Sequence, residues 1–311
     1  MSITVNILKV PSSDGIHTLC GKVYLPEGEA RGFFQIVHGM AEHIERYDAF
    51  MQKMASEGWI CFGHDHLGHK MSVMNDSELG FIASKHGDRL LVRDVKLFFD
   101  GVKKEYGNRV SSPTHILMGH SMGSFVVRLA AERELCPDKL IIMGTGGKNP
   151  LASIGLALIS LIKLLRGEKH ISRFIDNMAF GSYNKRFDNG TGKDPYLWLA
   201  SDNSAVRLYS DDKYCGFKFT VSAMGDLIRM IKLCNRSAWY KNLSKDIQVL
   251  LVSGSDDPVG NYAKGVREVE QKLKSQSIPT ECIIYEGVRH EILNDVSREE
   301  VTSDIIKFCQ K

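Results

Sequence analysis

The sequence has little of what marks secreted, membrane-spanning or thiolate-metal proteins. Its seven cysteines are odd in number and show no C-x-x-C spacing, which argues against a disulfide framework and a thiolate zinc site. The longest apolar stretch, residues 151–165, is too short to cross a bilayer and is interrupted by Lys163. No basic segment followed by an apolar core begins the chain, so we expect no signal peptide. These features predict a cytoplasmic protein.

The chain also has no large excess of positive or negative charge. The formal net charge of +3 is too small to indicate a nucleic-acid partner, and we expect none. Apolar residues make up 43% of the chain, which is typical of a globular protein. With 311 residues, the chain can bury one large core and carry an additional subdomain.

Short apolar segments alternate with helix-length segments at both ends of the chain. Strands are expected at residues 3–10, 19–25, 32–37, 59–63, 114–118, 139–143, 246–252 and 281–285, and helices at 46–57, 90–106, 124–133, 263–274 and 297–309. This alternation predicts an α/β fold with a mostly parallel central sheet flanked by helices.

In the middle of the chain the alternation stops. The sequence there is helix-like and loop-like, with breaks at residues 190–192 and 194–195. We therefore predict a core formed by residues 1–146 and 236–311, and an inserted helical cap formed by residues 147–235.

Residues 151–162 of this insert are apolar nearly all round. Such a helix can be buried between cap and core, line an acyl-chain channel, or touch a lipid surface, and we favour the channel. The basic residues that follow suit a weak, transient contact of the cap with a membrane or micelle: Lys163, Arg166, Lys169 and Arg173. Aromatic residues later in the insert are expected in cap packing or pocket walls: Trp198, Tyr209, Tyr214, Phe217 and Phe219.

Residues 119–123, Gly-His-Ser-Met-Gly, form a G-x-S-x-G signature between a strand-type and a helix-length segment. A serine at such a corner is held on a strained turn, with its hydroxyl clear of the sheet edge. The flanking glycines are needed because a Cβ there would collide with the tightly turning backbone. We predict that Ser121 is a nucleophile.

An activated serine needs a histidine to take its proton and a carboxylate to orient that histidine. On this type of sheet the order along the chain is nucleophile, acid, base. Asp256 and Asp257 follow the strand at 246–252, and His290 follows the strand at 281–285. All three are expected at the carboxyl edge of the sheet, where ligands collect in open α/β folds.

Negative charge develops on the carbonyl oxygen during attack, so an oxyanion hole is expected. One donor should be the backbone N–H of Met122, the residue after the nucleophile. The other should come from the loop after the third strand, where Gly39 allows close approach and the Met40 N–H is the candidate.

The histidine-rich residues 64–69 suggest a metal site. The di-zinc pattern H-x-H-x-D-H requires an acid where this chain has Gly68, and no second set of ligands is apparent. We expect neither a metal nor an organic cofactor.

Together these motifs resemble the α/β-hydrolase superfamily and, more narrowly, its monoacylglycerol lipase and lysophospholipase branch, which includes the so-called serine aminopeptidases. The residues that carry the resemblance are His38-Gly39, Glu42-His43, Tyr47, Asp65-His66-Leu67-Gly68-His69, Gly119–Gly123, Gly254-Ser255-Asp256-Asp257 and His290-Glu291.

In that family the acid is the fourth residue of a G-x-x-D turn, which selects Asp257. The resemblance also implies that the loop containing Asp65 and His66 is structural, and that the cap is mobile over the active site. Two positions depart from the family pattern, namely Met40 in place of a small residue and Lys70 in place of a glycine. Both departures bear on substrate preference.

We therefore expect a serine hydrolase of carboxylic esters, acting on monoacylglycerols or lysophospholipids through an acyl-enzyme. Alternatives on the same scaffold are a peptidase or amidase and a carboxylesterase of small esters. A non-enzymatic lipid-binding protein is a further alternative, but such proteins usually lose a triad member, and this chain retains all three.

Overall fold

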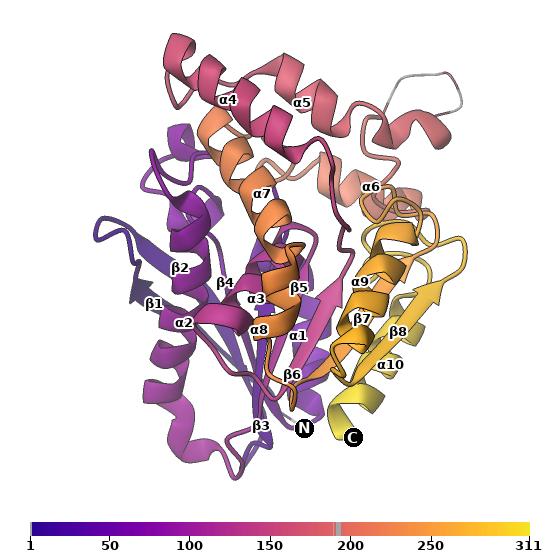
Figure 1. The fold of residues 1–311 in the computed structure, drawn as a ribbon. Coiled ribbons are helices and arrows are strands. Elements are labelled where there is room, and N and C mark those ends of the chain that lie inside the picture. The colour runs from indigo at the N-terminus through magenta and orange to yellow at the C-terminus, as the bar shows by residue number, and fades with distance from the viewer. Residues whose placement is uncertain (1, 189, 191–193) are drawn as a thin grey trace.

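The computed structural model describes residues 2–188, 190 and 194–311, and an eight-stranded sheet forms its centre (Figure 1). The strands are β1 (Thr4–Pro11), β2 (Thr18–Leu25), β3 (Gly32–Val37), β4 (Trp59–His64), β5 (His115–His120), β6 (Lys139–Met143), β7 (Gln248–Gly254) and β8 (Thr280–Tyr285). Their order is β1-β2-β4-β3-β5-β6-β7-β8. The pairs β1–β2 and β2–β4 are antiparallel and all later neighbours are parallel, which confirms the expected mostly parallel sheet.

Helices cover both faces of this sheet because strand side chains alternate between two apolar layers. In β3, Phe33 and Val37 join one layer, while Phe34 and Ile36 join the other. The first layer includes residues of α2 (Gly87–Tyr106), α3 (Met122–Arg133), α8 (Ser237–Asn242) and α9 (Lys264–Ser275). The second includes α1 (Asp48–Ser56) and α10 (Arg298–Gln310). Short 3-10 helices are η1 (Ile44–Tyr47), η2 (Lys70–Ser72), η3 (Asp76–Glu78), η4 (Gly107–Arg109) and η5 (Tyr183–Arg186).

A helical insert separates β6 from β7 and lies above the carboxyl ends of the parallel strands (Figure 1). It contains α4 (Ala152–Arg166), α5 (Arg173–Phe180), α6 (Asn203–Ser210) and α7 (Val221–Cys234). Helix α7 shares the apolar layer of α2 and α3, so the exact division into core and cap stays a prediction. Thr191 and Gly192 of the expected break lie outside the described residues.

Helix α4 corresponds to the apolar segment of the sequence, and most of it faces solvent. Leu164 is 81% exposed and Leu165 is 70% exposed. Its buried residues are Ala152, Gly155 and Ile159. The alternative of a helix buried between cap and core is therefore wrong. Within the described part of the chain, no helix combines the length and apolar character that crossing a bilayer requires.

Candidate active site

Ser121 sits at the corner between β5 and α3, as its sequence context predicts. Its backbone has φ 53° and ψ −120°, a region that residues with a Cβ rarely occupy. The turn is tight, because a Cβ on Gly119 would lie 2.3 Å from the Gly123 carbonyl oxygen. A Cβ on Gly123 would lie 2.1 Å from the Val37 carbonyl oxygen. Both glycines are thus required sterically, and the corner presents Ser121 to a cavity.

His290 and Asp257 meet at the same edge of the sheet. His290 Nδ1 lies 2.9 Å from Asp257 Oδ2, and both side chains are buried. The carboxylate also accepts hydrogen bonds from the Val259 N–H at 2.8 Å and the Ser253 hydroxyl at 3.4 Å. These contacts fix the carboxylate and, through it, the orientation of the imidazole.

The neighbouring Asp256 points elsewhere and forms an ion pair with Arg186 of the insert, at 3.0 Å. Asp257 is therefore the carboxylate in contact with His290, as the resemblance implied. Gly254 brings the two loops together, since a Cβ there would lie 1.9 Å from the Val288 carbonyl oxygen.

Ser121 and His290 line one cavity of about 820 Å³. Within the described residues, the buried His290 Nε2 has no hydrogen-bond partner, so it is not bonded to the Ser121 hydroxyl in this state. Such contacts are often long without substrate and tighten when it binds. The site thus combines a half-buried serine that lines the cavity, an imidazole with a free nitrogen, and a buried carboxylate.

The two residues expected to supply oxyanion donors, Met40 and Met122, line the same cavity as Ser121. Met122 is the first residue of α3, so its N–H has no acceptor four residues earlier within the helix. Met40 belongs to the oxyanion loop, residues 38–43, and lines the cavity together with Met122. A Cβ on Gly39 would lie 3.0 Å from the Ser121 Cβ, so this loop runs directly beside the nucleophile.

A buried carboxylate holds the oxyanion loop from below. Glu42 Oε1 accepts hydrogen bonds from the Gly39 N–H and, at 2.9 Å, from the Tyr47 hydroxyl. Arg46 Nε lies 3.3 Å from Oε2, and His120 Nδ1 lies 3.3 Å from Oε1. Burial opposes ionisation, but the hydrogen bond to His120 and the charges of His120 and Arg46 prevail and lower the pKa of Glu42 to about 2.

His120 extends this network to the candidate base. Burial alone would lower its pKa, but the hydrogen bond and charge of Glu42 outweigh burial and raise it. His120 Nε2 lies 3.2 Å from the His290 carbonyl oxygen. Arg46 also donates to Glu291, the residue after His290. Sequence reasoning quoted Glu42 and Glu291 within motifs but assigned them no role.

Two further contacts shape the surroundings of His290. Gly144 has φ +58°, and a Cβ there would lie 3.1 Å from His290 Cε1. The ring centroid of Trp198, from the insert, lies 5.1 Å from that of His290, and Trp198 lines the cavity. Trp198 is thus a pocket wall, one of the two roles expected for it. Sequence reasoning gave Gly144 no role, but its position directly after β6, at the carboxyl edge of the sheet, could have indicated one.

The histidine-rich loop at 64–69 has the structural character that the resemblance implied. Asp65 accepts two backbone N–H bonds, and the His66 N–H donates to His38 Nε2 at 3.0 Å. Burial lowers the pKa of His64 to about 3. It is also the largest cause of the lowered pKa of His69, which is about 4. These imidazoles are therefore neutral and packed below the oxyanion loop.

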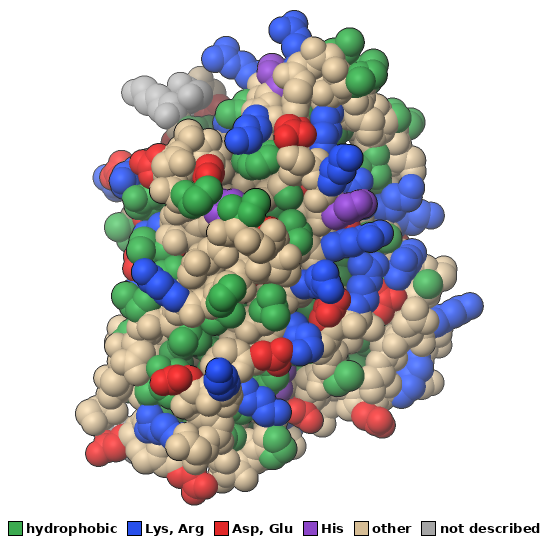
Figure 2. Space-filling view, turned by 90° about the vertical axis from the view of Figure 1, so that its left-hand side faces the viewer, with side chains coloured by type: hydrophobic (Ala, Val, Ile, Leu, Met, Phe, Trp, Pro, Cys, Tyr) green, Lys and Arg blue, Asp and Glu red, His purple; other side chains and the backbone are tan. Residues whose placement is uncertain are grey.

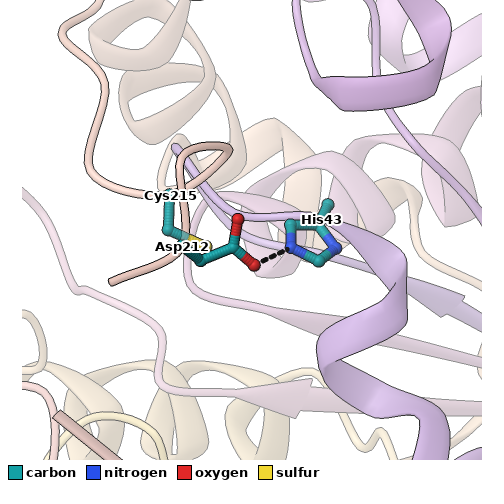
Figure 3. Close-up of side chains that lie close together, drawn as sticks. All are labelled: His43, Asp212 and Cys215. Atoms are coloured by element: carbon teal, nitrogen blue, oxygen red, sulfur yellow. Dashed lines mark hydrogen bonds and ion pairs between the residues drawn. The ribbon is translucent and has the colours of Figure 1, made fainter. Parts of the chain in front are cut away.

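A different triplet has metal-ligating side chains close together: His43, Asp212 and Cys215 (Figure 3). His43 Nε2 lies 2.8 Å from Asp212 Oδ2, and the Lys70 ammonium lies 3.3 Å from His43 Nδ1. Because that ammonium can only donate, Nε2 carries the proton and donates to Asp212, leaving no lone pair for a metal. Burial raises the pKa of Cys215 to about 12, which disfavours the thiolate that a metal requires. This arrangement fits a hydrogen-bonded link between insert and oxyanion loop, which sequence reasoning missed.

Apolar side chains from the core and the insert form much of the cavity wall. They include Phe125, Phe180, Leu199, Phe217, Leu227 and Ile231. None of the described residues of α4 lines this cavity, so the favoured interpretation of α4 as a channel wall is wrong. The helices of the insert that contribute lining residues are instead α5, η5, α6 and α7.

The sheet order, the strained serine corner and the helical insert define an α/β-hydrolase. The chain belongs to the family described as serine aminopeptidase S33, whose sequence model matches residues 28–297. It is 24% identical over 308 residues to the monoglyceride lipase of Mus musculus, which covers 95% of this chain and 86% of that protein.

Solved structures show the same fold. A thermostable carboxyl esterase from Bacillus coagulans, solved in complex with glycerol, superposes with a TM-score of 0.90 at 26% identity, covering 99% of both chains. A soluble variant of the monoglyceride lipase from Saccharomyces cerevisiae superposes with a TM-score of 0.76 at 17% identity, covering 98% of this chain and 95% of that chain. The chain is thus a serine hydrolase of the α/β-hydrolase fold, related to monoglyceride lipases and carboxylesterases.

Proposed function

We propose that this protein hydrolyses carboxylic esters of monoacylglycerol or lysophospholipid type, with Ser121 as nucleophile, His290 as base and Asp257 as the orienting acid. The observation that carries the proposal is the strained Ser121 corner opening into the same cavity as His290, whose other nitrogen is bonded to Asp257 at 2.9 Å.

In this mechanism His290 Nε2 takes the Ser121 proton as the serine oxygen attacks the ester carbonyl. The N–H groups of Met40 and Met122 bind the resulting oxyanion, each contributing about 3 kcal/mol to the transition state. His290 then protonates the departing alcohol. Water attacks the acyl-enzyme with His290 as base, and the fatty acid is released.

The cavity favours a lipid ester over a peptide. Its wall is rich in aromatic and aliphatic side chains, which suits an acyl chain. A peptidase of the aminopeptidase kind needs an acidic anchor for a free amine, but four acidic side chains of the wall are already paired with cations. Glu42 and Glu291 both pair with Arg46. Asp176 binds Lys218, and Glu268 binds Lys272. The relatives named monoglyceride lipase support the same substrate class.

Substitution of the nucleophile tests the mechanism. Ser121→Ala should lower kcat by about 10⁶ and abolish labelling by a fluorophosphonate probe. Ser275→Ala, which removes an exposed hydroxyl on α9, is the matched control and should change neither. Substantial turnover in Ser121→Ala would refute the assignment.

Substrate class is tested with a panel. It contains monoacylglycerols, lysophospholipids, p-nitrophenyl esters of increasing chain length, and aminoacyl-p-nitroanilides. Long-chain glycerol or phospholipid esters should give the highest kcat/KM. Preference for the shortest esters would instead indicate a small-ester carboxylesterase, and preference for the anilides a peptidase.

We further propose that residues 147–235 act as a cap that makes weak contact with lipid surfaces through α4. Its exposed apolar residues stand beside Lys163 and Arg166, a combination suited to an interface with anionic head groups. Leu164→Ser/Leu165→Ser should reduce cosedimentation with vesicles but leave hydrolysis of a short soluble ester unchanged. Undiminished cosedimentation of this variant would contradict the proposal.

A further inference from the structure

A second hollow, of about 860 Å³, lies among α2, the end of α3 and α7 and shares no lining residue with the cavity of Ser121. Seven Lys and Arg side chains line it against two carboxylates, in a chain whose whole net charge is only +3. In Figure 2, the Lys and Arg side chains (blue) gather on the right-hand half of the molecular face that is turned toward the viewer. We call this hollow the basic groove.

Three of its cations lie along one side of the groove. Arg89 and Arg93 stand one turn apart on the exposed side of α2, and Lys85 precedes that helix. Like charges four residues apart on a helix destabilise it. In the described part of the chain, none of these three side chains forms an ion pair.

The facing side has cations that are already partly neutralised. Arg229 binds Asp88 at 3.1 Å and Asp226 at 2.9 Å. Arg236 binds Glu132 at 2.7 Å. Of the two lining carboxylates, Asp88 is thus engaged by Arg229, which leaves Glu134 as the one lining carboxylate without an ion pair in the described residues. Within those residues, the positive charges of Lys85, Arg89 and Arg93 are not paired with any acidic side chain.

From this arrangement we propose that the basic groove binds an anion carrying two or more phosphate groups. Guanidinium groups bind phosphate oxygens with paired N–H donors. Residues four apart on a helix stand about 6 Å from one another, so Arg89 and Arg93 suit two phosphate groups better than one. The apolar lining residues are few, Val92 and Leu233, which argues against an acyl chain.

The ligand would also join two parts of the fold. Lys163 of α4 and Arg229 of α7 come from the insert, whereas Arg89 and Arg93 come from the core. A bound anion would therefore hold α4 and α7 against α2 and raise the melting temperature. This inference does not depend on the proposed ester hydrolysis.

Two arms of a binding experiment distinguish the sources of such an anion. The soluble arm titrates inorganic phosphate, pyrophosphate and ATP by calorimetry. The lipid arm compares vesicles of phosphatidylcholine with vesicles that also contain phosphatidylinositol bisphosphate. Arg89→Ala/Arg93→Ala should weaken binding of the multiply phosphorylated probe at least about tenfold. Lys103→Ala/Lys104→Ala removes the same charge from the far end of α2 and should leave binding within about twofold.

Circular dichroism and hydrolysis of a short ester test whether the variants fold. If the double variant Arg89→Ala/Arg93→Ala does not fold, the single variant Arg93→Gln replaces it. Tight binding in either arm, lost in the groove variant alone, supports the proposal. It is overturned if no probe binds below about 1 mM. Equal affinity for phosphate and pyrophosphate, or equal losses in both variants, overturns it as well.

Discussion

Glu42→Gln removes one charge from the buried network beneath the oxyanion loop while keeping the shape of the side chain. The carboxylate accepts hydrogen bonds from the Gly39 N–H and the Tyr47 hydroxyl, and it faces the Arg46 guanidinium and the His120 imidazole. The amide can accept fewer hydrogen bonds, and it removes one of the two carboxylates that pair with Arg46 and the carboxylate that raises the pKa of His120. We therefore expect a large loss of stability and a lower kcat, since Gly39 adjoins Ser121.

The expected loss follows from the pKa of Glu42, which folding lowers from 4.5 to about 2. That difference corresponds to about 3 kcal/mol in favour of the charged form of the folded state. Because the folded pKa is the lower one, this stabilisation is fully present above pH 4.5 and is lost as pH falls toward 2. Removing one partner of a buried ion pair independently costs about 3–5 kcal/mol. The two estimates overlap at about 3 kcal/mol at pH 7.

Urea unfolding of both proteins at pH 7 and pH 3 measures this effect. The stability gap should be about 3 kcal/mol at pH 7 and shrink by about 2 kcal/mol at pH 3. Glu45→Gln is the control, because Glu45 lies three residues away with a side chain 38% exposed and pairs with Lys70 and Lys22. It should cost less than about 1 kcal/mol. A gap below about 1 kcal/mol at pH 7, or one independent of pH, would refute the reasoning.

Three other outcomes are expected. Gly144→Ala should lower kcat/KM about tenfold by displacing His290. Gly28→Ala is the control, because Gly28 also has a positive φ (+77°) but an added Cβ there meets nothing within 4 Å. This variant should lose about 1 kcal/mol of stability and keep the rate unchanged. Asp257→Asn should reduce kcat by about 10⁴ and Asp256→Asn by less than about tenfold, since only Asp257 contacts His290; equal effects would contradict the assignment. Exhaustive chelation should leave ester turnover unchanged, and activity restored by added zinc would show that a metal takes part.

Local sequence patterns predicted the parts of the fold that local physics determines. The serine corner requires glycines at fixed spacing and a strand and a helix on either side, so Gly119–Gly123 identified it. Parallel strands end at one edge of a sheet, so the residues that follow β7 and β8 were expected to meet there. The structure does bring Asp257 and His290 into contact.

Contacts between distant segments could not be predicted in this way. The hydrogen bond from His43 to Asp212 spans 169 positions, and that from Arg46 to Glu291 spans 245. Nothing in the local pattern of either residue indicates its partner. The prediction that α4 lines the channel was wrong for a related reason. Its sequence is apolar nearly all round, so it does not indicate which face packs against the protein and which faces solvent.

The oxyanion loop is held from two sides, and this constrains how substrate reaches Ser121. On the core side, Glu42 accepts a hydrogen bond from the loop. On the insert side, the Tyr209 hydroxyl donates to the Ala41 carbonyl at 2.9 Å. Asp212 of the insert also accepts a hydrogen bond from His43. Each such bond contributes about 1 kcal/mol, so lifting α6 and the turn after it would disturb the proposed oxyanion donors. Movement of α5, whose Phe180 lines the cavity, leaves those bonds intact. Access beside α5 is therefore the route compatible with a preorganised oxyanion hole.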